Sequence, residues 1–148
     1  MLFRSLAPRL TAMSEYLRWK TSLPPRLSEL AILITAREWT AQYEWFAHYP
    51  LAIKAGLDPN IAADIAAGKR PDNMKDDETA LYDLATALYH DKKVPDSIYK
   101  AALDKFGERG IMDIIGIMGY YDITSMTLIT MQAGAPNDSV KPLPVLEK

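Results

Sequence analysis

The segment PPRLSELAILITAREWTAQYEWFAHYPLAIKAGL, residues 24–57, carries the clearest structural pattern in this 148-residue chain. Its paired prolines suit the start of a helix, because proline already has the backbone angle that the first helical position needs. Apolar residues then recur at helical spacing, at Leu27, Leu30, Ala31 and Ile34. Thr40 is predicted to cap the start of a second helix, which ends at Gly56. The segment therefore predicts two consecutive helices, over 25–37 and 41–55.

The rest of the chain follows the same helical pattern. Strict alternation of polar and apolar residues is missing, and so are hairpin dipeptides such as Asn-Gly. Further helices are predicted over 6–20, 58–67, 76–91, 95–106 and 108–132. Pro50 removes a backbone donor and predicts a kink or restart inside the helix 41–55. We expect an all-α protein of about six or seven helices in a single domain, residues 1–148, with a proline-containing C-terminal arm over 134–148.

Composition narrows the class of protein. A net charge of −2, from 17 basic and 19 acidic residues, provides no basic surface for nucleic acid. The lack of any cysteine excludes disulfides, thiolate metal sites and cysteine nucleophiles, and the cytoplasm is the default location. The apolar segment 110–133 is interrupted by Asp113 and Asp122, and a charge at the bilayer centre costs roughly 2.5–3.5 kcal/mol on insertion scales. We therefore expect a buried or subunit-contact helix and no membrane partner.

Glu44 and His48 are the first candidates for chemistry. They are four residues apart, so they share one face of a helix, and a carboxylate beside an imidazole suits acid–base work near neutral pH. Tyr43 and Trp45 are large side chains with polar tips, which commonly line ligand pockets. Glu29 borders the buried stripe of the helix 25–37, and an imidazole is one candidate partner for it. Two other interpretations of Glu44 and His48 remain open: an ordinary Glu–His pair on the surface, and a metal site in which Glu29 is a third ligand.

Four polar residues elsewhere are further candidates. Tyr120 and Tyr121 follow two glycines on the apolar helix, so they either pack in the core or bring a hydroxyl to the site. Asp122 on the same helix is either a helix contact or a pocket acid, and it needs a partner if it is buried and ionised. His90, near the end of the helix 76–91, is interpreted as a cation at a helix C-terminus.

Several motifs, in order along the chain, resemble the signature region of the carboxymuconolactone decarboxylase family. These are PPRL, a glutamate on the same helix, YEW with a histidine four residues beyond its glutamate, PLAIKAGL and FGERGIMDIIGIMGYY, all within residues 15–132. That family shares a helical fold with the alkylhydroperoxidase D (AhpD) proteins. The resemblance implies an AhpD-like fold and a homo-oligomer, either a trimer or a hexamer.

The resemblance also implies a type of reaction. In its peroxidase branch a glutamate, a Cys-x-x-Cys pair and a histidine would fall on Glu29, Ala41, Glu44 and His48. Without thiols neither sulfenic acid nor a disulfide can form, so this chain acting alone cannot be a thiol peroxidase. The decarboxylase branch is implied instead, with γ-carboxymuconolactone or another small carboxylated lactone as substrate. Protonated His48 would supply a proton and Glu44 or Glu29 would orient it, and neither a cofactor nor a metal is expected.

Substrate contacts are assigned to four residues. Tyr43 and Trp45 would form the pocket wall, Arg37 would bind the substrate's negative charge, and Tyr120 would offer a hydroxyl. Arg26 is a second nearby cation. Two alternatives remain open, an AhpD-like peroxidase, which the lack of cysteine opposes, and a non-catalytic ligand-binding oligomer with the same fold.

Overall fold

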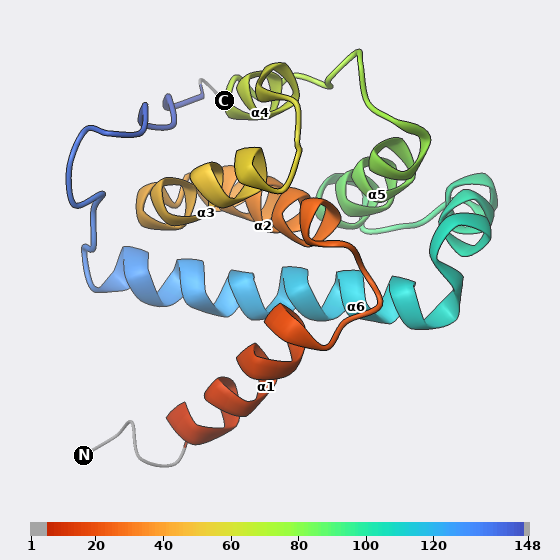
Figure 1. The fold of residues 1–148 in the computed structure, drawn as a ribbon, viewed down its shortest axis with the longest axis horizontal. Coiled ribbons are helices and arrows are strands. Elements are labelled where there is room, and N and C mark those ends of the chain that lie inside the picture. The colour runs from red at the N-terminus through yellow and green to blue at the C-terminus, as the bar shows by residue number, and fades with distance from the viewer. Residues whose placement is uncertain (1–5, 147–148) are drawn as a thin grey trace.

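The computed structural model describes residues 6–146, and this range contains helices and no strands (Figure 1). The helices, in order, are α1 (Ala7–Trp19), α2 (Pro25–Trp39), α3 (Gln42–Lys54), α4 (Pro59–Ala66), α5 (Asp76–Thr86) and α6 (Asp96–Thr130). A π-helical turn, η2 (Ala87–Asp91), follows directly after α5. The prediction of an all-α fold with about six or seven helices is confirmed.

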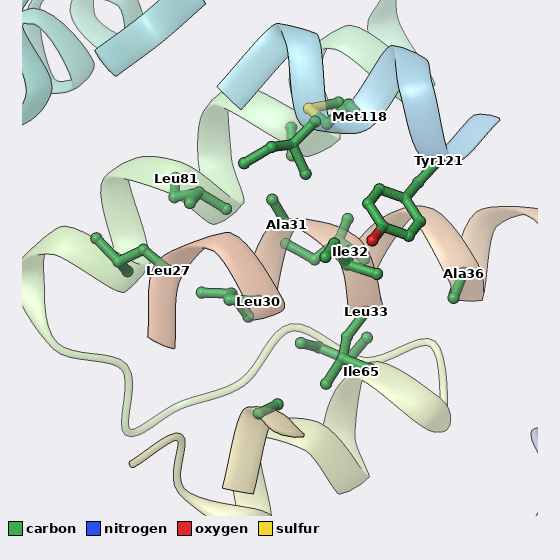
Figure 2. Close-up of a cluster of buried hydrophobic side chains, with 14 of the residues drawn as sticks. Leu27, Leu30, Ala31, Ile32, Leu33, Ala36, Ile65, Leu81, Met118 and Tyr121 are labelled. Atoms are coloured by element: carbon green, nitrogen blue, oxygen red, sulfur yellow. The ribbon is translucent and has the colours of Figure 1, made fainter. Parts of the chain in front are cut away.

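The helix α2 is the centre of the molecule. It packs against α3, α4, α5 and α6, and α1 contacts α6. In Figure 1, α6 runs the length of the molecule, with α2 and α3 on one side of it and α1 on the other. Leu30, Ala31 and Leu33 of α2 are completely buried, and Figure 2 shows these side chains among those of the neighbouring helices. Because α2 is enclosed by other helices, some of its polar side chains are buried, among them Thr35 and Arg37.

The start of each helix follows from local chemistry, with one correction. Pro25 lies in the first turn of α2, and Asp58 caps α4 by accepting a hydrogen bond from the backbone N–H of Asn60. Thr40, however, does not cap α3. It ends α2 in a left-handed conformation with φ of 51°, and Ala41 takes the N-cap position of α3. The helix α3 continues through Pro50 to Lys54, so no restart occurs there.

The long α6 consists of the two helices expected from the sequence, joined at one glycine. Gly107 has φ of 65° and ψ of 175° inside the helix, a conformation that is essentially restricted to glycine. Gly107 separates the first segment of α6, in which Lys105 forms an ion pair with Asp76 of α5, from the apolar second segment. No helix within residues 6–146, including the apolar part of α6, has the length and hydropathy needed to span a membrane.

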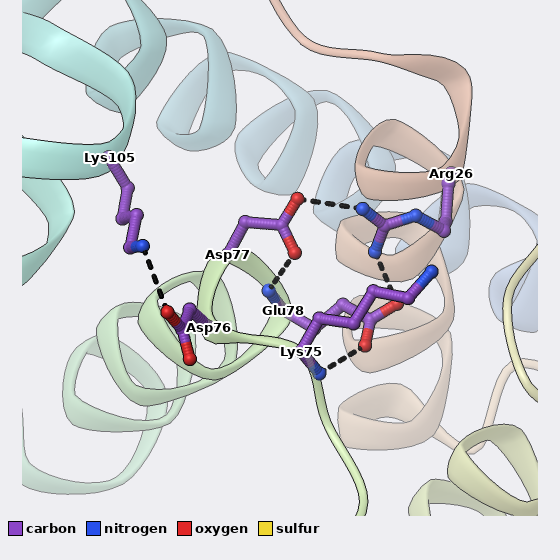
Figure 3. Close-up of polar contacts among 6 residues, drawn as sticks. All are labelled: Arg26, Lys75, Asp76, Asp77, Glu78 and Lys105. Atoms are coloured by element: carbon purple, nitrogen blue, oxygen red, sulfur yellow. Dashed lines mark hydrogen bonds and ion pairs between the residues drawn. The ribbon is translucent and has the colours of Figure 1, made fainter.

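An ionic network fixes the start of α5 against the start of α2 (Figure 3). Arg26 of α2 binds both Asp77, at 2.7 Å, and Glu78. Glu78 is only 1% exposed, and it also accepts a hydrogen bond from the backbone N–H of Lys75 at 2.7 Å. Arg26 is therefore engaged in holding the fold together.

The C-terminal arm lies along the body and reaches α4 (Figure 1). The side chain of Gln42 forms two hydrogen bonds of 2.9 Å with the backbone of Leu143, one to its C=O and one from its N–H. Val140 and Leu143 are buried. The arm is thus attached through both backbone hydrogen bonds and apolar contacts.

Candidate active site

His48 lies between two glutamates. Its Nδ1 is 2.7 Å from Oε2 of Glu29, and its Nε2 is 3.4 Å from Oε2 of Glu44. Glu29 comes from α2, whereas Glu44 and His48 come from successive turns of α3. The three side chains are between 6% and 12% exposed. The structure thus brings together the three residues to which the sequence assigned catalysis, and the imidazole partner considered for Glu29 is present.

Within this cluster, the surroundings of Glu44 favour its protonated form. Burial raises the pKa of Glu44, with a further contribution from the charge of Glu29, while the charges of His48 and Arg18 act in the opposite direction. A carboxyl group with a raised pKa holds its proton at a higher pH than an exposed glutamate does. Because each ring nitrogen of His48 faces one carboxylate oxygen, Glu44, His48 and Glu29 form a line along which a proton can move.

One end of this line opens into a pocket, which we call the Glu29 pocket. It has a volume of about 280 Å³ and lies between α1, α2 and α6, with Glu29, Arg18 and Tyr121 among its lining residues. The Tyr121 ring meets the ring of His48 edge-on, with 4.9 Å between centroids. Leu17, Leu23 and Ile32 provide apolar wall. Glu29 is therefore the member of the cluster that lines this pocket.

Arg18 and Tyr121 add polar groups to the same pocket. Nη1 of Arg18 donates a hydrogen bond of 3.2 Å to the hydroxyl of Tyr121. Burial raises the pKa of Tyr121 well above its usual range, against the effect of Arg18, so the phenol stays protonated at neutral pH. The pocket thus combines a cation, a neutral hydroxyl and a carboxyl group connected to an imidazole.

The four residues to which the sequence assigned substrate binding lie elsewhere. Trp45 is buried, stacks on Tyr49 with 5.9 Å between ring centroids, and lines a different pocket beneath the C-terminal arm. Tyr43 is 38% exposed, and Arg37 binds backbone carbonyls of α4 and the arm. Tyr120 packs edge-on against its neighbour Tyr121. None of the four is among the residues that line the Glu29 pocket, so their substrate-binding roles stay predictions.

Sequence reasoning does not single out Arg18. Its position in the pocket depends on how α1 packs against α6, and the two side chains that meet there are 103 residues apart. The sequence offers Tyr120 and Tyr121 together as hydroxyl donors, but adjacent residues on a helix point in directions about 100° apart. Tyr121, which is 4% exposed, lines the Glu29 pocket, and Tyr120 is not among its lining residues.

The other polar residues considered from the sequence have partners away from this pocket. Asp122 accepts hydrogen bonds from Trp39 Nε1, at 2.6 Å, and from the hydroxyl of Tyr89, at 2.9 Å. It is therefore a helix contact between α6, α2 and η2. His90 lies 2.7 Å from Glu38 of α2.

The positions of Glu29, Glu44 and His48 also bear on the alternative that these three residues bind a metal ion. Glu29 and Glu44 face opposite nitrogens of the His48 ring, so one ion could not be ligated by both carboxylates and by the ring between them. Among residues 6–146 no three His, Asp or Glu side chains are arranged to hold a metal ion. The arrangement suits proton transfer along the line of groups.

Comparison with known proteins supports the fold and leaves the activity open. No protein-family model matches the sequence, and no curated protein is significantly similar to it. Among solved structures, a protein of unknown function from Agrobacterium tumefaciens, described as a candidate AhpD antioxidant defence protein, superposes with a TM-score of 0.78. The match covers 90% of this chain and 92% of that chain, at 15% sequence identity. The chain therefore has the AhpD-like helical fold.

Proposed function

We propose that this protein is a carboxymuconolactone decarboxylase-like enzyme that works by acid–base chemistry without a cofactor. The observation that supports this best is the link from His48 through Glu29 into the Glu29 pocket. The proposed substrate is a small carboxylated lactone such as γ-carboxymuconolactone, an intermediate of aromatic-compound degradation. A volume of about 280 Å³ lies just below the usual range for ligand pockets, so the Glu29 pocket fits only a compact molecule.

The proposed reaction is balanced by one proton. The bond between the lactone ring and its carboxylate carbon breaks, carbon dioxide leaves, and the electron pair is delocalised through the unsaturated lactone. The ring carbon then takes up a proton that His48 supplies through Glu29 of the pocket wall, and the proton is replaced from Glu44 and finally from solvent. A general acid at hydrogen-bond distance typically contributes about 100- to 10,000-fold to a rate.

Arg18 and Tyr121 are proposed to position the substrate. A guanidinium binds a carboxylate through charge-assisted hydrogen bonds, and Arg18 is the cation that lines the Glu29 pocket. This differs from the expectation from sequence, which placed Arg37 in that role. The Tyr121 hydroxyl, held by Arg18 at 3.2 Å, would bind the lactone carbonyl.

We further propose that the enzyme is a homo-oligomer built through α6. Large apolar side chains recur on its exposed side at spacings of three and eight residues, which keep them on one face of a helix. They are Met112, Ile115, Ile123 and Met126. Their exposed fractions are 64%, 40%, 38% and 43%. A second copy is the expected partner because the resemblance implies a trimer or a hexamer. Light scattering on the purified protein would measure the assembly.

The AhpD-like peroxidase remains the other enzymatic candidate because of the description of the structural neighbour. The chain contains no cysteine, and a thiolate is the nucleophile in thiol peroxidases. A peroxide-consumption assay with the pure protein tests this directly. Turnover of peroxide would contradict the decarboxylase proposal.

The decisive experiment measures loss of γ-carboxymuconolactone by ultraviolet absorbance, together with release of carbon dioxide. We expect Glu29→Gln and His48→Gln to lower kcat about 100-fold or more, because each interrupts proton delivery. Arg18→Met should mainly raise KM, because it removes binding of the carboxylate. Glu44→Gln should change the pH profile of kcat, since Glu44 acts through His48.

Glu108→Gln is the matched control, because Glu108 is an exposed glutamate of α6 away from the pocket. It should have wild-type rates. Absence of turnover with γ-carboxymuconolactone and related carboxylated lactones would refute the proposed activity. Turnover that survives in both Glu29→Gln and His48→Gln would refute the site.

A further inference from the structure

A second pocket lies at the other end of α2, and we call it the Arg37 pocket. It has a volume of about 380 Å³ and lies between α2, α4, α5 with η2, and the C-terminal arm. Its polar lining includes Arg37, Glu38, Lys69 and His90, and its apolar wall includes Ile65 and Val145. None of these residues belongs to the Glu29–His48–Glu44 cluster. The pocket is therefore separate from the proposed active site.

Arg37 is an unusual lining residue because its charge is almost completely buried. The residue is 6% exposed, and its guanidinium donates to the backbone carbonyls of Ala66 and Pro144 and to the hydroxyl of Thr40. Nε is buried without a hydrogen-bond partner among the described residues. No carboxylate of residues 6–146 forms an ion pair with Arg37.

Burying an unpaired charge is costly unless something compensates for it. The carbonyl of Ala66, in the last turn of α4, compensates in part through the negative end of that helix. A full negative charge in the pocket would compensate further. Burial lowers the pKa of Arg37, while the charge of Glu38 acts in the opposite direction.

A local distortion of the backbone brings His90 to this pocket. The α-helical pattern of α5 changes to the π-helical turn η2, Ala87–Asp91, and Nε2 of His90 then lies 2.7 Å from Oε1 of Glu38. Such turns occur frequently at functional sites. This observation is independent of Arg37 and points to the same pocket.

We propose that the Arg37 pocket binds a small organic anion, namely a monocarboxylate with an apolar or aromatic body. The cations Arg37 and Lys69 select the carboxylate, and the side chains of Ile34, Ile65, Tyr82, Val145 and Leu146 enclose the apolar part. Among residues 6–146, Glu38 is the one acidic residue that lines the pocket, and His90 is positioned to neutralise it. The proposal does not depend on the decarboxylase activity.

Benzoate is a suitable probe, and benzamide is its uncharged control of nearly the same shape. Titration of the full-length protein would be followed by two-dimensional NMR of backbone amides. We expect benzoate to shift the amide signals of Gly68, Thr86 and His90 saturably, with little effect on Ser28 beside Glu29. Benzamide should bind at least about tenfold more weakly, as expected for loss of a charge-assisted hydrogen bond.

Two substitutions of exposed residues, Lys69 and Glu38, test the charge selectivity while Arg37 stays in place. Lys69→Met should weaken benzoate binding and Glu38→Gln should strengthen it, each by roughly two- to fivefold, as for partly exposed charge pairs. Arg37→Met should weaken binding at least about tenfold if its NMR spectrum shows a folded protein. If Arg37→Met does not fold, the opposite effects of Lys69→Met and Glu38→Gln on benzoate affinity still show whether the pocket selects a negative charge.

Three results would overturn the proposal. The first is that no amide of the Arg37 pocket shifts saturably with millimolar benzoate. The second is that benzamide binds as tightly as benzoate, which would show that charge is not recognised. The third is that Lys69→Met and Glu38→Gln change the affinity in the same direction, which would indicate a purely structural role for these charges.

Discussion

Arg26→Met is the substitution that most directly tests how α2 is held in place. Arg26 contacts two carboxylates, but their surroundings differ. The Glu78 side chain is 1% exposed, and the Asp77 side chain is 33% exposed. Removal of the guanidinium therefore leaves one carboxylate buried with a single remaining donor, the backbone N–H of Lys75.

The expected cost follows from that asymmetry. Breaking a buried ion pair by removing one partner costs about 3–5 kcal/mol of unfolding free energy. The Arg26 side chain itself is 14% exposed, so some water can reach the site and the lower end, about 3 kcal/mol, is expected for Arg26→Met. Asp77→Asn removes only a partly exposed pair and should cost about 1 kcal/mol or less.

Urea unfolding, followed by far-UV circular dichroism, measures both values. The double variant Arg26→Met with Glu78→Gln is the sharpest control, because the substituted amide can still accept a hydrogen bond from the backbone N–H of Lys75 but carries no charge. It should be more stable than Arg26→Met alone. If Arg26→Met cost less than Asp77→Asn, or if the double variant were no more stable than Arg26→Met, the buried charge would not be the source of the effect.

Three other substitutions test separate features. Burial opposes ionisation of Asp113, but hydrogen bonds from the backbone and hydroxyl of Ser22 and from Tyr16 hold the pKa of Asp113 below its usual value of 3.8. The stabilisation from these bonds is present above pH 3.8 and is lost as the pH falls through the folded-state pKa. In urea titrations, Asp113→Asn should therefore cost about 1–3 kcal/mol of unfolding free energy near pH 6 and clearly less near pH 2.5. Gly107→Ala meets no neighbouring atom within 4 Å, yet φ of 65° with ψ of 175° should make it about 1–3 kcal/mol less stable, and wild-type stability would contradict the strained conformation. Gln42→Ala removes both bonds to Leu143 and should speed proteolysis of the C-terminal arm, whereas an unchanged cleavage rate would show that apolar contacts alone hold it.

Much of the fold and the core of the candidate site could be predicted from the sequence, because local signals are strong in helical proteins. Helical spacing, proline at helix starts and glycine at helix ends place every helix of residues 6–146 within a few positions. The i, i+4 spacing places Glu44 and His48 on one face. The position of Glu29 beside the buried stripe suggests the imidazole partner that the structure shows at 2.7 Å.

What could not be predicted depends on how helices pack against each other. Arg18 comes to the candidate site through contact between α1 and α6, which no local pattern specifies. The change from α5 to η2 is equally hidden, since the sequence over 76–91 has a regular apolar stripe. Threonine is a common N-cap, which favours Thr40 at the start of α3, but the tight connection between α2 and α3 instead requires a left-handed residue at that position.

The expected and observed positions of Arg37 show why residues close in sequence can serve different sites. Glu29 and Arg37 lie on the same helix, eight residues apart, which corresponds to about 12 Å along the axis. Because α2 is surrounded by other helices, polar side chains at its two ends enter different gaps. Glu29 faces the gap between α1 and α6, and Arg37 faces the gap between α4, α5 and the C-terminal arm. A single buried helix thus carries an acid for one pocket and a cation for another. Because the two side chains line different pockets, the proposed catalytic site and the proposed anion site can be tested independently, by substitutions at Glu29 and at Arg37.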